Sequence, residues 1–120
     1  KVKMKLSPMI ETIKGKSVIV VDDSIVRGTT SRRIVRMLKE AGASQVHMRI
    51  SSPPTTDPCY YGVDTPNKEK LIAANMSIDE ICEFIEADSL AYLDEAALLR
   101  SVNATEDNYC TACFTGKYIV

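Results

Sequence analysis

The chain lacks a strong charge of either sign. Lysine and arginine number 15 against 16 aspartate and glutamate residues in a chain of 120, which leaves a net charge of −1. A balance this close to neutral gives no electrostatic attraction to nucleic acid or to a membrane surface. We therefore expect neither of them as a partner.

Long apolar runs are missing as well. No stretch reaches the roughly 18 apolar residues that a membrane span needs. The basic residues 1–5 have no adjoining apolar segment of the signal-peptide type, and the sequence contains no repeats or low-complexity segments. These absences predict a cytoplasmic protein domain.

The predicted elements alternate along the chain. With 45% hydrophobic residues, the chain is expected to form a single domain that buries roughly two thirds of its unfolded surface. The β-α-β order predicts an α/β fold with a small parallel sheet, flanking helices and right-handed crossovers. Strands are predicted at 17–21, 45–51 and 90–93, and helices at 31–41, near 68–74, at 78–86 and at 94–102, before an irregular cysteine-bearing tail.

The most informative segment begins with the apolar residues 18–21, which predict a strand covered on both faces. Asp22 and Asp23 follow it, at the carboxyl end of a parallel strand, where ligands of such sheets bind. Gly28 then permits a tight turn with positive φ. Thr29, Thr30 and Ser31 supply hydroxyls and an N-cap for the next helix, whose free N–H groups favour an anion.

Each half of this loop also has an ordinary structural explanation, as a plain turn and a plain helix cap. The two halves together favour a ligand. Two adjacent carboxylates repel each other unless a cation or hydroxyl donors relieve them. A ligand that combines a diol or a metal with a phosphate would use every group in the loop.

The segment Asp22-Asp23-Ser24-Ile25-Val26-Arg27-Gly28-Thr29-Thr30 resembles the phosphoribosyl pyrophosphate (PRPP) loop of type I phosphoribosyltransferases, and within them it is most similar to the amidophosphoribosyltransferases. The resemblance continues through residues 52–54, 58–64, 69–74, 87–90 and 110–118. It implies the carboxyl-terminal part of a phosphoribosyltransferase domain spanning 1–120. Residues 1–16 would be a lead-in segment, 17–102 the PRPP-binding core and 103–120 a cluster-binding tail.

The same resemblance implies an enzyme that makes 5-phosphoribosylamine, glutamate and pyrophosphate from PRPP, glutamine and water, in the first step of purine synthesis. Asp22 and Asp23 would hold the ribose hydroxyls, directly or through Mg²⁺, and the loop backbone would hold the 5-phosphate. Ser24 would fix the loop, and Arg27 would contact either the phosphate or a structural partner. The implied substrate-binding residues are Asp22, Asp23, Ser24, Val26, Arg27, Gly28, Thr29 and Thr30, with no catalytic residue in this chain.

Four cysteines form a second group. Disulfides are not expected in a cytosolic chain, and the Cys110-x-x-Cys113 spacing is shared by metal, cluster and redox sites. Cys82 is predicted to be a packed thiol on a helix. The resemblance implies that Cys59, Cys110 and Cys113 bind a 4Fe-4S cluster whose fourth cysteine lies upstream of Lys1. A zinc site completed by Cys82 or by His47, the only histidine, is the alternative.

The resemblance also places the glutaminase domain and the pyrophosphate-binding loop upstream of this chain, so that we expect these 120 residues alone to be inactive. It implies PRPP and the glutaminase domain as partners, purine nucleotides as feedback inhibitors, and a homo-oligomer for the intact enzyme. The alternative function is a phosphoribosyltransferase-like regulator that senses PRPP or a nucleotide without turnover.

Overall fold

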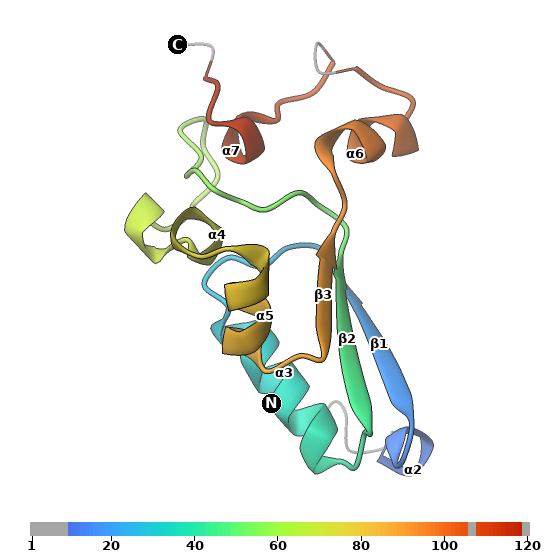
Figure 1. Ribbon diagram of the computed structural model, residues 1–120. Helices are drawn as coiled ribbons and strands as arrows, with labels where there is room; N and C mark the ends of the chain where they lie inside the picture. The colour runs from blue at the N-terminus through green and yellow to red at the C-terminus, as the bar shows by residue number, and fades with distance from the viewer. Residues whose placement is uncertain (1–9, 106–107, 119–120) are drawn as a thin grey trace.

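The computed structural model describes residues 10–105 and 108–118. Residues 1–9, most of the expected lead-in segment, lie outside this range, as do the last two residues of the expected tail. Figure 1 shows a single sheet with helices packed against one of its sides and two further helices beyond the carboxyl ends of its strands.

The sheet has three strands that are parallel, as the sequence predicted, and their order is β1-β2-β3. They are β1 (Ser17–Asp22), β2 (Gln45–Ile50) and β3 (Ser89–Tyr92). Helix α3 (Thr29–Glu40) connects β1 to β2, and α4 (Ile72–Asn75) and α5 (Ile78–Ile85) lie between β2 and β3 in the chain. The α/β fold class is confirmed.

The core lies between the sheet and the helices. In β2 the side chains of Val46, Met48 and Ile50 point into it and are at most 3% exposed. They pack with Val35 and Leu38 of α3 and with Ile81 and Ile85 of α5, all of them buried. Apolar residues recur at helical spacing in both helices, which is why they cover the sheet with one face each.

The expectation that β1 is covered on both faces is wrong. Val18 and Val20 pack against the core, but Ile19 is 66% and Val21 73% exposed. The reason is topological. Successive strands advance in one direction, so right-handed crossovers place α3, α4 and α5 on the same side of the sheet (Figure 1). Among the described residues no helix covers the other side.

The region predicted as one helix near 68–74 is two short pieces. A 3₁₀ helix spans Lys68–Lys70, Leu71 is extended and fully buried, and α4 follows. The Asn75 side chain donates hydrogen bonds to the carbonyls of Lys68, Glu69 and Leu71, which holds the two pieces together.

The remaining helices are short. Helix α2 (Ile10–Ile13) precedes β1, α6 (Glu95–Ser101) follows β3, and α7 (Ala112–Thr115) lies in the tail that was expected to be irregular. Asp94 caps α6 by accepting a hydrogen bond from Ala97 N–H at 2.7 Å. In the part of the chain that the structure describes, no helix has both the length and the apolarity to cross a membrane.

Candidate functional site

A pocket of about 340 Å³ opens where β1 ends, lined by the ten consecutive residues from Asp22 to Ser31. The strand delivers Asp22 to the carboxyl edge of the sheet, and the loop then turns back to start α3 (Figure 1). All eight residues that the sequence analysis assigned to the site line this one pocket: Asp22, Asp23, Ser24, Val26, Arg27, Gly28, Thr29 and Thr30.

The two carboxylates form one wall of the pocket. The Asp23 N–H donates to Asp22 Oδ1 at 2.8 Å, and the Ser24 hydroxyl donates to Asp23 Oδ1 at 3.0 Å. Asp22 is half-buried and Asp23 exposed. Among the described residues no lysine, arginine or histidine forms an ion pair with either carboxylate. The negative charge on this wall is thus left for a cation or for hydroxyl groups to offset.

The amino-terminal end of α3 lines the same pocket. The helix begins at Thr29, and its N-cap is Gly28 in the left-handed region, with φ 84°. The prediction that Thr29, Thr30 and Ser31 supply the N-cap is wrong, because all three lie inside the helix, in its first turn, and Ser31 is 4% exposed. Among the described residues no side chain caps the end. Its N–H groups therefore face the pocket and suit an anion.

Val26 and Arg27 of the loop differ in their contacts with the rest of the domain. The Val26 carbonyl accepts a hydrogen bond from the Ile72 N–H at 2.9 Å, which ties the loop to α4. Arg27 is exposed, and within the described ranges its side chain has no ion-pair partner. Both interpretations of Arg27, as a phosphate ligand and as a structural residue, stay open.

The sequence analysis did not assign Ile25 or Ser31 to the site. Ile25 is 1% exposed and belongs to the core, so it anchors the loop from below. Its signal in the sequence was an apolar pair, Ile25-Val26, inside an otherwise polar loop. Ser31 was recognised only as a capping residue.

Three of the four cysteines lie outside the sheet and its covering helices: Cys59 is in the loop that follows β2, and Cys110 and Cys113 are in the tail. The Tyr61 N–H donates to Cys59 Sγ at 3.4 Å, and the backbone N–H groups of Tyr61, Val63 and Gly62 lower the pKa of the Cys59 thiol. Burial raises the pKa of Cys113, and the nearby Cys110 and Cys59 raise it further. Cys59 and Cys110 therefore lie near enough to Cys113 for their charges to disfavour its thiolate.

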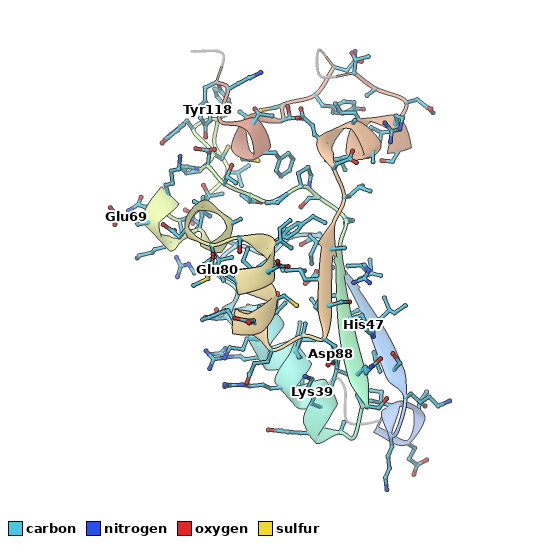
Figure 2. All side chains as sticks on the ribbon, in the orientation of Figure 1. Lys39, His47, Glu69, Glu80, Asp88 and Tyr118 are labelled. Atoms are coloured by element: carbon cyan, nitrogen blue, oxygen red, sulfur yellow. The ribbon has the colours of Figure 1, made fainter. Side chains whose placement is uncertain are left out.

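The tail docks onto the loop that carries Cys59. The Cys113 carbonyl accepts hydrogen bonds from the Thr56 and Asp57 N–H groups at 3.0 and 3.1 Å. The Tyr118 hydroxyl, labelled in Figure 2, donates to the Pro58 carbonyl at 2.5 Å. The fold thus brings Cys59 toward the Cys110-x-x-Cys113 segment.

Within residues 10–105 and 108–118, however, no three histidine, cysteine, aspartate or glutamate side chains stand close enough together to hold a metal ion. Cys82 lies on α5, as predicted, and donates to the Ala87 carbonyl at 3.3 Å. His47 lies on β2, where its Nδ1 is hydrogen-bonded to Ser89 Oγ at 2.6 Å (Figure 2). Both candidates for completing a zinc site are bonded elsewhere.

Comparison with known proteins gives one consistent result. The family model of the phosphoribosyl transferase domain matches residues 1–75. An amidophosphoribosyltransferase of Synechocystis is 56% identical over 117 residues, which are 98% of this chain and 24% of the relative. A chloroplastic amidophosphoribosyltransferase of Glycine max is 59% identical over 119 residues, 99% of this chain and 21% of the relative.

Solved structures agree. A glutamine PRPP amidotransferase from Bacillus subtilis, complexed with ADP and GMP, superposes with a TM-score of 0.85 at 52% identity, over 92% of this chain and 25% of that protein. A structure described as the allosteric regulatory enzyme of purine biosynthesis gives the same TM-score, 0.85, at 53% identity. This chain spans about a quarter of the length of the proteins it matches.

Proposed function

Because this chain belongs to the phosphoribosyltransferase family, we propose that its pocket binds the ribose 5-phosphate part of PRPP in an amidophosphoribosyltransferase. The observation that carries the proposal is that one pocket is lined both by an acidic pair without an ion-pair partner among the described residues and by a helix end without a side-chain cap. The relatives described above are named amidophosphoribosyltransferases, which favours this enzyme over a PRPP-sensing regulator.

The acidic pair would bind the hydroxyl groups of the ribose, and the start of α3 would bind its 5-phosphate. Asp22 and Asp23 would accept hydrogen bonds from the ribose 2- and 3-hydroxyls, or would hold them through Mg²⁺, which prefers carboxylate, water and substrate oxygens. The backbone N–H groups from Val26 to Thr30, with the hydroxyls of Thr29 and Thr30, would bind the 5-phosphate. The hydrogen bond from Ser24 to Asp23 supports the assignment of Ser24 to fixing the loop.

In the intact enzyme these contacts would hold PRPP while ammonia displaces pyrophosphate at C1. The C1–N bond would form as the C1–O bond to pyrophosphate breaks, and the proton that the new ammonium group loses would pass to solvent or to the released pyrophosphate. Mg²⁺, held by Asp22 and Asp23, would supply positive charge for the leaving group. No side chain of this chain needs to act as a nucleophile. Its residues hold the ribose while charge develops at C1, and ammonia would come from glutamine in a glutaminase domain. We expect the 120 residues alone to bind PRPP without turnover.

The test is isothermal calorimetry with PRPP and Mg²⁺. The double variant Asp22→Asn, Asp23→Asn should abolish the Mg²⁺-dependent binding, because it removes both negative charges and leaves the shape of the pocket. Asp64→Asn, on an exposed loop outside the pocket, is the control and should bind as the unsubstituted chain does. Equal binding by the double variant and the control would contradict the assignment of the acidic pair.

We further propose that Cys59, Cys110 and Cys113 bind a 4Fe-4S cluster, completed by a cysteine from outside these 120 residues. Support comes from the backbone N–H groups around Cys59, which stabilise a thiolate, and from the docking of the tail beside it. Among the described residues, the three thiols do not stand close enough together to hold a metal ion. The cluster would fasten the tail to the domain and take no part in the reaction.

Anaerobic iron-sulfur reconstitution tests the cluster. We expect Cys113→Ser to lose the cluster absorbance and Cys82→Ser to keep it, because Cys82 is bonded on α5 away from the tail. If the two variants behave alike, the assignment of the ligands is wrong. Reconstitution with zinc alone, at equal stoichiometry and dependent on Cys82 or His47, would favour the alternative site.

The remaining partners belong to the intact enzyme. The Bacillus subtilis relative was solved in complex with ADP and GMP, which supports purine nucleotides as ligands of the intact enzyme; that they inhibit it is part of the proposal. A homo-oligomer remains part of the proposal. Binding of GMP to this chain in competition with PRPP, measured by the same calorimetry, would place a nucleotide in the pocket described here.

A further inference from the structure

The backbone of the phosphate-facing loop rests on two apolar side chains from the helices behind it. A Cβ atom placed on Gly28 would lie 2.8 Å from Ile72 Cδ1 and 3.2 Å from Phe84 Cδ2 and Cε2. These distances are shorter than ordinary van der Waals contact. The loop therefore has no room to move backward at Gly28, the N-cap residue of α3.

A hydrogen bond adds a second fixed point. The Ile72 N–H donates to the Val26 carbonyl at 2.9 Å, and the Ile72 side chain is 6% exposed in the core. The loop is thus held at Val26 and at Gly28 by the same residue of α4. Neither Ile72 nor Phe84 lines the pocket, so both act from behind the loop.

The Phe84 ring is itself held on its other side by α3. The Arg32 guanidinium carbon lies 5.1 Å from the ring centroid, a cation–π distance. Arg32 Nε is 3.6 Å from Glu86 Oε2, and Arg36 Nε donates to the same oxygen. The Phe84 ring thus lies against Gly28 and also contacts Arg32, which Glu86 at the end of α5 holds in place.

We propose that Phe84 is a positioning residue for the pocket: with Ile72 it fixes Gly28, so that the first N–H groups of α3 point at the bound phosphate. It touches no substrate atom. This inference rests on the proposed function, because the pocket matters only if a phosphate binds there. The physical basis of the inference is that a binding site keeps its geometry only when the residues packed behind it hold its backbone and side chains in place.

The test compares Phe84→Ala with Leu38→Ala. Leu38 is a buried core residue near the carboxyl end of α3, 4% exposed and away from the loop. Both variants lose packing, but only the first removes the support of Gly28. Where circular dichroism shows the variants folded, Phe84→Ala should weaken PRPP binding about tenfold, and Leu38→Ala should stay within about twofold, since its lesion lies outside the supporting layer. Phe84→Tyr keeps the aromatic ring and should bind PRPP as the unsubstituted chain does.

Hydrogen exchange without ligand separates this inference from the proposed function. Peptides covering residues 24–31 should exchange faster in Phe84→Ala and unchanged in Leu38→Ala. If exchange changes as expected but the unsubstituted chain does not bind PRPP, the proposed function fails and the support of the loop stands. If the unsubstituted chain binds PRPP but Phe84→Ala alters neither exchange nor affinity, the inference is overturned. Phe84→Leu replaces the alanine variant if the latter does not fold.

Discussion

Gly28 combines two constraints at one position. Its φ of 84° lies in the left-handed region, and a Cβ there would come within 2.8 Å of Ile72 Cδ1. Gly15 shares only the first constraint, because its φ is 74° and nothing lies within 4 Å of a Cβ placed on it. The two glycines therefore separate backbone strain from steric collision.

We predict that Gly15→Ala lowers the free energy of unfolding by about 1–2 kcal/mol, the usual cost of a side chain in the left-handed region. Gly28→Ala should cost a further 1–3 kcal/mol or so, because the new methyl group must displace Ile72 or Phe84. Urea unfolding followed by circular dichroism measures both. Equal costs at the two positions would mean that the loop moves aside freely.

At the scale of elements, one carboxylate lies where three segments of the chain come close together. Asp57 Oδ1 accepts from Lys68 Nζ at 2.9 Å, on the 3₁₀ helix, and Asp57 Oδ2 accepts from the Thr56 hydroxyl at 2.9 Å. A Cβ on Gly116, at the end of α7, would lie 3.1 Å from the same Oδ2. The hydrogen bond from Lys68, and then that from Thr56, lowers the pKa of Asp57 below its ordinary 3.8.

This lowered pKa predicts a pH dependence of stability. A carboxyl group with a depressed folded pKa stabilises the protein above its unfolded pKa, and the stabilisation is lost as the pH falls through the folded pKa. Asp57→Asn should therefore lower the free energy of unfolding by about 1 kcal/mol at pH 6. The difference should begin to shrink as the pH falls toward the unfolded pKa of 3.8, and it should be lost once the pH falls through the lower folded pKa. Urea unfolding between pH 2 and 7 measures it, and a constant difference would contradict the prediction.

The starts of two helices explain what could be predicted locally. The start of α5 was predicted at Ile78, where it lies, and Ser77 with Glu80 forms a capping box there, seen in both hydrogen bonds. The start of α3 was placed too late, because Gly28 caps it without a side chain. A glycine N-cap depends on the packing behind it, and that packing involves Ile72 and Phe84, far away in sequence.

At the scale of the whole molecule, the alternation of elements was enough to predict the parallel sheet, and the acidic pair with the glycine loop was enough to predict one pocket. The exposure of one face of β1 was not predictable from composition. Four apolar residues in a row are compatible with one or two covered faces, and the choice depends on where the helices lie after the crossovers. The cysteine ligand set stays a prediction, because among the described residues the thiols do not stand close enough together to hold a metal ion.

Adjacent valines on β1 test this account of the sheet. Val20 packs against the core, and Val21 is 73% exposed on the uncovered side. Valine and threonine have nearly the same shape, so threonine changes the polarity of one methyl position and little else. In this chain Val20→Thr should lower the free energy of unfolding by about 1–2 kcal/mol, because the hydroxyl is taken from water without a partner. Val21→Thr should change it by less than about 0.5 kcal/mol. Urea unfolding of the two variants decides the matter, and a larger cost at Val21 would mean that the outer face of the sheet is covered in solution.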